Sequence, residues 1–135
     1  TMKKDYYSKK AKQEGYLARS TYKLKQINKK YNLIKNKDNI LDLGCYPGGW
    51  VQAALEIIGN GGKIIGIDMI DVKVKGNNFE FCKLNVFDEK LPDLISRFNK
   101  FDVVISDLAP KTTGIRRLTG FQAIGLHQGH WRLQG

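Results

Sequence analysis

The sequence is poor in cysteine and in long apolar runs, and each shortage excludes a class of protein. Its 135 residues include only two cysteines, Cys45 and Cys82, with no CxxC pair. A disulfide scaffold and a four-ligand zinc site are therefore excluded, and neither cysteine is expected to act as a nucleophile. No run approaches the ~20 apolar residues of a membrane-spanning helix, and no apolar signal segment opens the chain. We expect an intracellular protein without a membrane anchor.

Acidic side chains are scarce at the N-terminus, where the basic residues concentrate. Residues 1–37 contain 12 Lys and Arg against two acids, whereas residues 38–135 contain 11 basic and 11 acidic side chains. The formal net charge of +10 therefore lies in the N-terminal segment. Five tyrosines stand among its lysines, a mixture that suits nucleic acid because rings stack on bases while cations meet phosphates. The alternative interpretation is a solvated, lysine-rich helix face.

The apolar pattern predicts an α/β body after this basic segment. Strands are expected at residues 40–43, 63–68, 79–84 and 101–107, and helices at about 17–31, after Pro47, and over 91–98. Strands that alternate with helices favour a mostly parallel sheet covered by helices.

A glycine loop and an acid give this body a ligand-binding pattern. The segment from Asp42 to Trp50 passes from a strand through Gly44, Gly48 and Gly49 into a helix, and Asp68 ends the next strand. Such folds place a ribose-binding acid at that point. Because the loop is neither GxGxxG nor a Walker loop, the pattern disfavours a dinucleotide or ATP. It favours an adenosyl ligand without a diphosphate, and S-adenosylmethionine fits.

These residues resemble the FtsJ/RrmJ family of RNA 2′-O-ribose methyltransferases. The matching segments follow one another over residues ~5–116, namely Asp5-Tyr6-Tyr7, Glu14-Gly15-Tyr16, Tyr22-Lys23-Leu24, Asp42-Leu43-Gly44, Pro47-Gly48-Gly49-Trp50, Gly66-Ile67-Asp68, Val86-Phe87-Asp88, Ser106-Asp107-Leu108-Ala109-Pro110 and Thr113-Gly114-Ile115-Arg116. The resemblance implies a Rossmann-like fold for S-adenosylmethionine-dependent methyl transfer. Its closest branch acts on ribosomal RNA, which makes ribosomal RNA or a ribosomal subunit the expected partner. A base-amino methyltransferase is disfavoured because the segment after Asp107 lacks the aromatic residue of that class. The cytoplasm, nucleolus and mitochondrion are not distinguished.

The resemblance also implies roles for individual residues. Lys23 and Asp107 match half of a catalytic Lys-Asp-Lys-Glu tetrad. The cofactor contacts implied are Gly44, Cys45, Pro47, Gly48, Gly49, Trp50, Asp68, Met69, Asn85, Val86 and Asp107. Trp50 is expected chiefly to pack within its helix, and Asn85 replaces the aspartate that usually faces the adenine. The RNA contacts implied are Lys9, Lys10, Lys12, Arg19 and Lys23, and no metal is expected, since His127 and His130 lack a third ligand.

The C-terminal part departs from the family pattern. Residues 114–135 contain no lysine, asparagine or acid, and the family's second lysine and its glutamate are not matched. We therefore divide the chain into a basic helical segment (1–37), the cofactor-binding half of the domain (38–116) and an atypical tail that is not the native continuation (117–135). This division predicts a monomer whose fourth strand is unpaired on one side and prone to association. It also predicts cofactor binding with weak methyl transfer, or a module that binds adenosyl groups and RNA without catalysis.

Overall fold

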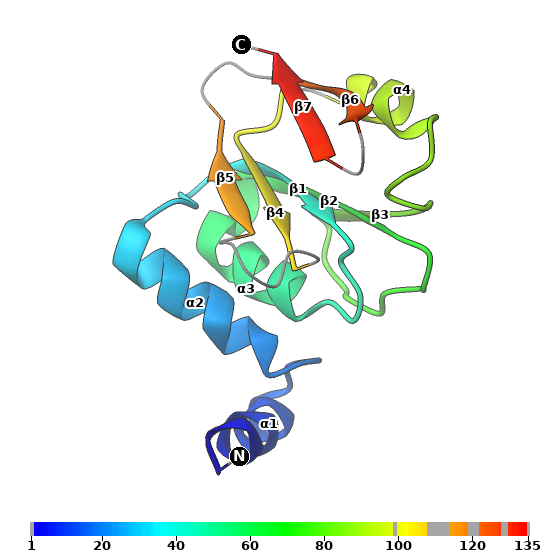
Figure 1. The fold of residues 1–135 in the computed structure, drawn as a ribbon. Coiled ribbons are helices and arrows are strands. Elements are labelled where there is room, and N and C mark those ends of the chain that lie inside the picture. Colours follow the sequence, from blue (N-terminus) through cyan, green and yellow to red (C-terminus); the bar gives the residue numbers. More distant parts are fainter. Residues whose placement is uncertain (1, 99, 108–113, 119–121, 128–129, 135) are drawn as a thin grey trace.

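The computed structural model describes residues 2–98, 100–107, 114–118, 122–127 and 130–134. Two N-terminal helices precede strands that alternate with helices (Figure 1). The helices are α1 (Met2–Glu14), α2 (Ser20–Tyr31), α3 (Gly49–Ile58) and α4 (Leu91–Ser96). The strands are β1 (Asn39–Leu43), β2 (Lys63–Asp68), β3 (Phe79–Lys83), β4 (Val103–Ser106), β5 (Ile115–Arg117), β6 (Gln122–His127) and β7 (His130–Gln134). None of the described helices is long and apolar enough to cross a membrane.

The described strands form a mostly parallel sheet of order β3-β2-β1-β4-β5 and a separate β6-β7 pair. In the larger sheet β1 runs parallel to both β2 and β4, and β2 runs parallel to β3. The predicted α/β architecture is confirmed, and the four predicted strands agree with β1 to β4 to within two residues at each end. The N-terminal helix α1 lies inside the segment that the sequence analysis described only as basic and helical.

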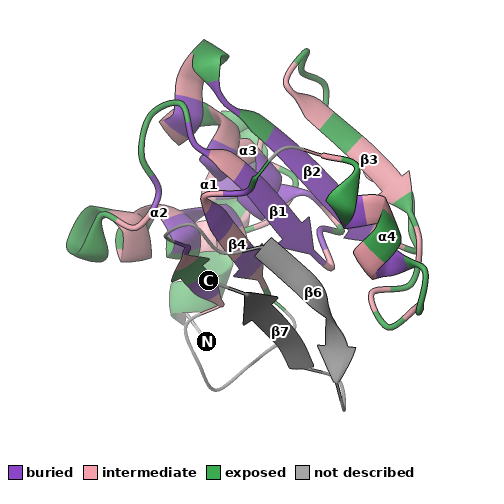
Figure 2. Cartoon of the chain, turned by 90° about the horizontal axis from the view of Figure 1, so that it is seen from above, coloured by how far each residue is buried: buried purple, intermediate pink, exposed green. Residues whose placement is uncertain are grey.

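The central strands are buried on both faces because helices cover each side. Ile40 and Ile64 belong to the apolar cluster that contains side chains of α2 and α3, whereas Leu41 and Ile65 join Leu91 of α4 on the other face. Figure 2 shows β1 and β2 mostly buried, and β3, at the edge of the sheet, with intermediate and exposed residues. This burial on both faces explains why β1 and β2 read as near-continuous apolar runs.

The prediction of an unpaired fourth strand is wrong. β5 pairs antiparallel with β4, with Val103 opposite Arg117 and Ile105 opposite Ile115, and both β4 side chains are fully buried. The chain turns back closely enough that a Cβ on Gly114 would collide with the carbonyl oxygen of Ser106, so only glycine fits there. The boundary predicted after residue 116 also falls inside β5, and the origin of residues 117–135 stays a prediction.

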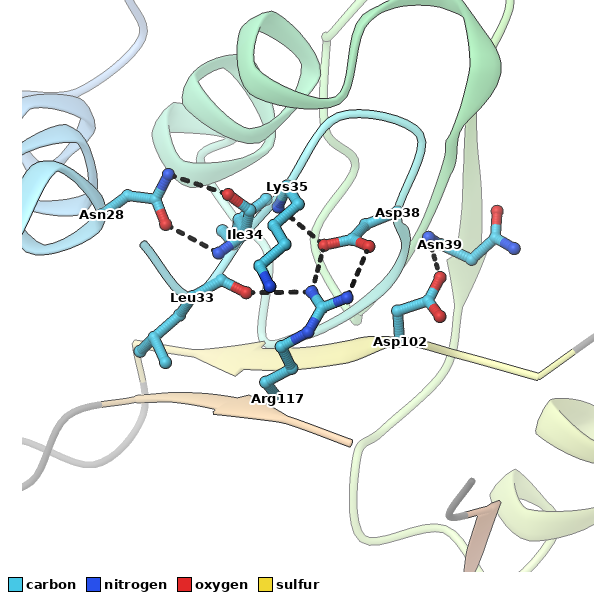
Figure 3. Close-up of polar contacts among 8 residues, drawn as sticks. All are labelled: Asn28, Leu33, Ile34, Lys35, Asp38, Asn39, Asp102 and Arg117. Carbon is cyan, nitrogen blue, oxygen red and sulfur yellow. Dashed lines mark hydrogen bonds and ion pairs between the residues drawn. The ribbon is translucent and has the colours of Figure 1, made fainter. Parts of the chain in front are cut away.

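Arg117 fastens β5 to the loop that precedes β1 (Figure 3). Its Nη1 and Nη2 donate to the two carboxylate oxygens of Asp38, at 2.6 Å and 3.2 Å, and Nη1 also donates to the carbonyl oxygen of Leu33. The backbone N–H of Lys35 donates to the same carboxylate. Asp38 is buried, and the hydrogen bonds that it accepts raise the pKa of Arg117.

Candidate active site

The candidate site lies at the edge of the sheet where the parallel strands end. β1, β2 and β4 share one direction, so Leu43, Asp68 and Ser106 bring the segments that follow them to the same edge. The loop after β1 begins at Gly44, whose φ of 76° lies in the left-handed region. The backbone N–H groups of Gly44 and Cys45 both donate to the carbonyl oxygen of Ile67, which holds the loop against β2.

Asp68 joins the glycine loop to the segment after β2. Its Oδ2 accepts a hydrogen bond from the backbone N–H of Tyr46 at 2.9 Å, and its Oδ1 accepts from Met69 and Ile70 at 2.7 Å and 3.3 Å. The two oxygens of a carboxylate offer about four acceptor positions, and three backbone N–H groups already use part of this capacity. The same oxygens therefore have only part of their capacity left for two ribose hydroxyls. The structure thus brings the predicted ribose acid and the predicted glycine loop into direct contact.

The segment after β3 reaches the same edge. The backbone N–H of Leu84 donates to the carbonyl oxygen of Asp68, which places Asn85 and Val86 close to the ribose acid. Asn85 is exposed, and its Oδ1 accepts from the backbone N–H of Phe87, so its amide is held in a local turn. Val86 packs against the α4 side of the core, and Met69 stays 59% exposed. A flat base at this edge would meet apolar surface and one oriented amide.

Asp42 is a site residue that the sequence analysis did not assign. It is 1% exposed, and its Oδ2 is a buried side-chain oxygen without a hydrogen-bond partner among the described residues. Burial, and then the charges of Asp107 and Asp68, raise its pKa well above the ordinary value. The signal available in the sequence was an acid between apolar residues of a buried strand. A buried oxygen with no partner here fits a ligand that donates hydrogen bonds and carries positive charge.

Two glycine-loop residues pack α3 against the start of α2, and only for Trp50 was a packing role expected from the sequence. A Cβ on Gly49 would lie 2.8 Å from Thr21 Oγ1 and 3.0 Å from the Cβ of Ala18, and Thr21 Oγ1 donates to the Gly49 carbonyl oxygen. Trp50 is buried, and its Nε1 donates to the carbonyl oxygen of Ser20. Both residues therefore bring the start of α2 against α3.

The remaining loop residues differ in what they expose. The side chain of Cys45 is buried, and burial raises the pKa of its thiol, which leaves its backbone as the part able to face a ligand. Gly48 begins α3 with a φ of 117°, and Val72, Val74 and Leu17 occupy the space beside its Cα. Pro47 is half-buried between them. Gly48 thus needs glycine on two counts, its backbone conformation and its close neighbours.

Lys23 and Asp107, the predicted catalytic pair, line one cavity of about 470 Å³. Lys23 comes from α2 and Asp107 from the residue after β4, and both are exposed. Asp107 also raises the pKa of Asp42, so the cavity adjoins the acidic end of β1. The remaining lining residues are Lys3, Lys4, Tyr7, Arg19, Ser20, Tyr22 and Gln26. The structure therefore places the predicted catalytic pair between the carboxyl ends of the parallel strands and the basic N-terminal helices.

The predicted RNA-binding cations divide between two places. Arg19 and Lys23 line the cavity, whereas Lys9 and Lys10 line a different part of the α1 surface, and Lys12 is exposed on the same helix. Lys10 also pairs with Glu14 at 3.9 Å.

The sequence analysis missed three α1 residues in the cavity wall, Lys3, Lys4 and Tyr7. Their spacing of three and four residues would have placed them on one face, had the bounds of this helix been predicted within the basic helical segment.

The described residues hold no group of three His, Cys, Asp or Glu side chains suited to a metal ion.

Comparisons with known proteins were made on the sequence and on the fold. The sequence model of a family described as FtsJ-like methyltransferase matches residues 16–133. The chain is 42% identical over 116 residues to ribosomal RNA large subunit methyltransferase E of Bdellovibrio bacteriovorus, covering 84% of this chain and 59% of that protein. It is 41% identical over 127 residues to the protein of the same name from Methanothermobacter thermautotrophicus, covering 92% and 60%. The chain thus spans about 60% of the length of these relatives.

A solved structure is similar as well. The crystal structure of a Plasmodium falciparum protein, provisionally assigned as a ribosomal RNA methyltransferase, superimposes with a TM-score of 0.56 at 32% identity. The match covers 73% of this chain and 59% of that one.

Proposed function

Because the chain belongs to the FtsJ-like methyltransferase family, we propose that it takes part in methyl transfer from S-adenosylmethionine to a ribose 2′-hydroxyl of RNA. The substrate we propose is ribosomal RNA, in view of the relatives named above. The observation that carries the proposal is the double position of Asp107, which lines the cavity of Lys23 and also acts on the buried Asp42. We expect such a protein to work inside the cell, where ribosomal RNA is made and assembled.

The residues at the cofactor edge fit an adenosyl sulfonium ligand. Asp68 would accept from the ribose hydroxyls, and Asn85 would offer the adenine both an acceptor and donors. Gly44 and Gly48 would allow close approach of the amino-acid end. Asp42 would accept from its ammonium group, which would give the orphaned Oδ2 a partner. The bound cofactor supplies an electrophilic methyl group.

Lys23 and Asp107 would act on the ribose hydroxyl. Methyl transfer to oxygen needs the hydroxyl held in line and relieved of its proton, so alignment supplies much of the rate. Lys23 can take the single proton of the hydroxyl when the amine is neutral, and the carboxylate of Asp107 can stabilise the ammonium group that forms. The cavity around them holds further cations that suit the neighbouring phosphates.

The second candidate function is binding of the adenosyl ligand and RNA without catalysis. No glutamate is among the described residues that line the cavity, so the glutamate of the tetrad implied by the resemblance has no counterpart there. Lys23 and Asp107 would then position RNA without completing the proton transfer.

Methyl transfer to large-subunit ribosomal RNA tests the proposal. The chain is incubated with undermethylated ribosomal subunits and isotopically labelled S-adenosylmethionine, and labelled 2′-O-methylnucleosides are measured after complete nuclease digestion. We expect label on ribose, reduced strongly in Lys23→Ala and Asp107→Ala. Cofactor binding by calorimetry without any transfer would support the non-catalytic module, and absence of both would contradict the proposed function.

A further inference from the structure

The wall of the Lys23–Asp107 cavity that α1 provides has no role in the chemistry described so far. α1 contributes Lys3, Lys4 and Tyr7 to a cavity whose remaining described lining comes from Arg19, from α2 and from Asp107. Its volume of about 470 Å³ falls within the range of small-ligand pockets, about 300–1,000 Å³. The cavity is thus of a size to hold a single nucleotide unit.

Tyr7 presents a ring that neighbouring side chains hold in place. Its centroid lies 5.4 Å from that of Tyr22, with the two planes at 37°, and its hydroxyl accepts from Gln26 Nε2 at 3.1 Å. Tyr22 is itself buried and donates to Glu14 at 2.6 Å. A half-buried ring with few freedoms left to lose makes a good stacking platform for a base.

The charges around this ring suit phosphate. Four of the described lining side chains, Lys3, Lys4, Arg19 and Lys23, are basic, against the single carboxylate of Asp107. That balance disfavours a cationic or neutral apolar ligand and favours one that carries anionic groups next to an aromatic plane. A nucleotide in an RNA chain combines the two.

We infer that this cavity receives one unpaired nucleotide of RNA, with its base stacked on Tyr7, its phosphates near Lys3 and Arg19, and its ribose toward Lys23 and Asp107. The inference rests on the proposed function, since it takes the substrate to be RNA. Tyr7 can reach a base only when that base is out of a helical stack, because both faces of a stacked base are covered. The site therefore selects a flexible or extruded nucleotide over a paired one.

Binding of penta-adenylate and of the same backbone without bases separates stacking from charge. We expect Tyr7→Ala to weaken binding of penta-adenylate by about five- to 150-fold, the range for one stacked base, and to leave the abasic chain unaffected. Tyr7→Phe keeps the ring and should keep most of the affinity. Lys3→Ala should weaken both probes equally. Tyr31→Ala is the matched control, because Tyr31, the last residue of α2, is 56% exposed and is not among the described residues that line the cavity.

Two results would overturn the inference, namely equal losses for both probes in Tyr7→Ala or no loss at all. A second measurement uses the unaltered chain, so that a folding defect of the variant cannot decide the result. Pentanucleotides with a central 5-iodouridine are irradiated with the protein, and the cross-linked peptide is identified by mass spectrometry. A cross-link at Tyr7 supports the site, and cross-links confined to other residues contradict it. Neither assay contains cofactor, so this inference can fail while methyl transfer is observed, and the reverse.

Discussion

At the scale of single residues, the arrangement of three carboxylates defines the site. Asp42 lies within β1 next to its last residue, Asp68 ends β2 and Asp107 follows β4, and each has a different environment. Asp68 accepts three backbone hydrogen bonds, Asp107 is exposed, and Asp42 is buried with one oxygen unpartnered. The same residue type thus supplies an ordered acceptor, a solvent-facing group and a carboxyl whose ionisation opposes folding.

The buried carboxyl of Asp42 predicts a specific pH dependence. Its pKa is raised in the folded protein, so above pH ~4 the folded state holds a proton that the unfolded state has lost. Asp42 therefore lowers stability as pH rises from ~4 toward its folded pKa, by up to ~1.4 kcal/mol per pH unit. In Asp42→Asn this component should vanish. Urea unfolding at several pH values between 4.5 and 8, without cofactor, measures the difference, and parallel profiles would contradict the expectation.

The proposed ribose contacts of Asp68 predict a loss of cofactor affinity. Asp68→Ala removes two acceptors and also releases Tyr46 of the glycine loop, so S-adenosylmethionine should bind more weakly by about 1–3 kcal/mol. Calorimetric titration measures the change. Asp71→Ala serves as the control, since its exposed carboxylate only pairs with Lys83 at 3.7 Å. Wild-type affinity in Asp68→Ala would remove this acid from the site.

At the scale of elements, α2 contacts both α1 and α3 and lines the cavity. It carries Lys23, its first turn meets Gly49 of α3, and its Tyr22 packs against Tyr7 of α1. Tyr16, between α1 and α2, adds a hydrogen bond to Glu56 of α3 at 2.6 Å. The position of the predicted base thus depends on how closely α2 packs on α3.

Because the position of Lys23 depends on how α2 packs on α3, we predict that one added methyl group at Gly49 lowers activity. In Gly49→Ala the new Cβ would meet the first turn of α2, so the helix must shift or the protein loses about 1–3 kcal/mol of stability. We expect RNA methyl transfer to fall more than cofactor binding, because α2 moves Lys23 while Asp68 stays in place. Gly76→Ala is the matched control, since its Cβ would make only ordinary contacts at 3.6 Å. An equal effect of both substitutions on transfer would refute the mechanism.

The positive charge of α1 predicts that the affinity for RNA falls as the salt concentration rises. Residues 2–13 contain five lysines, and each phosphate neutralised on single-stranded RNA contributes ~0.7 to the slope of log affinity against log salt. Deleting these residues should therefore flatten the slope by up to ~3.5. Fluorescence anisotropy with a labelled single-stranded RNA at several salt concentrations measures both slopes. If the deletion left the slope unchanged, these lysines would be better explained as a solvated helix face that does not bind RNA.

An element could be predicted from the sequence where the pattern that specifies it lies within its own residues. β1, β2 and α3 carry their apolar pattern within their own residues, so they were predicted closely. β5 was missed because Ile115-Arg116-Arg117 is short and charged, and it becomes a strand only through pairing with β4 and the Asp38 ion pair. α1 lacks apolar periodicity, so its cavity residues could not be assigned. Lys23 and Asp107 could be predicted as a pair because their motifs lie within the sequence itself, and the structure brings both to one cavity.

At the scale of the whole molecule, the two ends of the parallel strands carry different features. The carboxyl ends of β1, β2 and β4 form the candidate site, whereas Arg117 and Asp38 meet at the opposite edge, where β1 begins. Antiparallel β5 is the reason, since it carries the chain back from one edge to the other. Stability and chemistry can therefore be altered independently.

From the position of the Arg117–Asp38 pair we predict that its loss lowers the stability of the protein and leaves cofactor affinity unchanged. Arg117→Ala leaves the buried Asp38 carboxylate without its bidentate partner, which should cost about 2–4 kcal/mol in the free energy of unfolding. Arg116→Ala, one residue earlier and exposed, is the control and should be nearly neutral. Urea unfolding gives the stabilities, and calorimetry should give unchanged cofactor affinity at temperatures where the variant is folded. Weaker cofactor binding in Arg117→Ala, with unchanged stability, would contradict the stabilising role assigned to this pair.

The burial of Cys45 and the partial burial of Cys82 have a practical consequence for labelling. Burial raises the pKa of both thiols, which leaves them mostly protonated and poorly reactive toward maleimides at neutral pH. A cysteine introduced at exposed Asn60, in the turn that leads into β2, would then be the preferred point of attachment. A dye or a solid support fixed there would sit at the edge away from the cavity. The protein could thus be immobilised in one orientation with the side that carries the cavity open to solution.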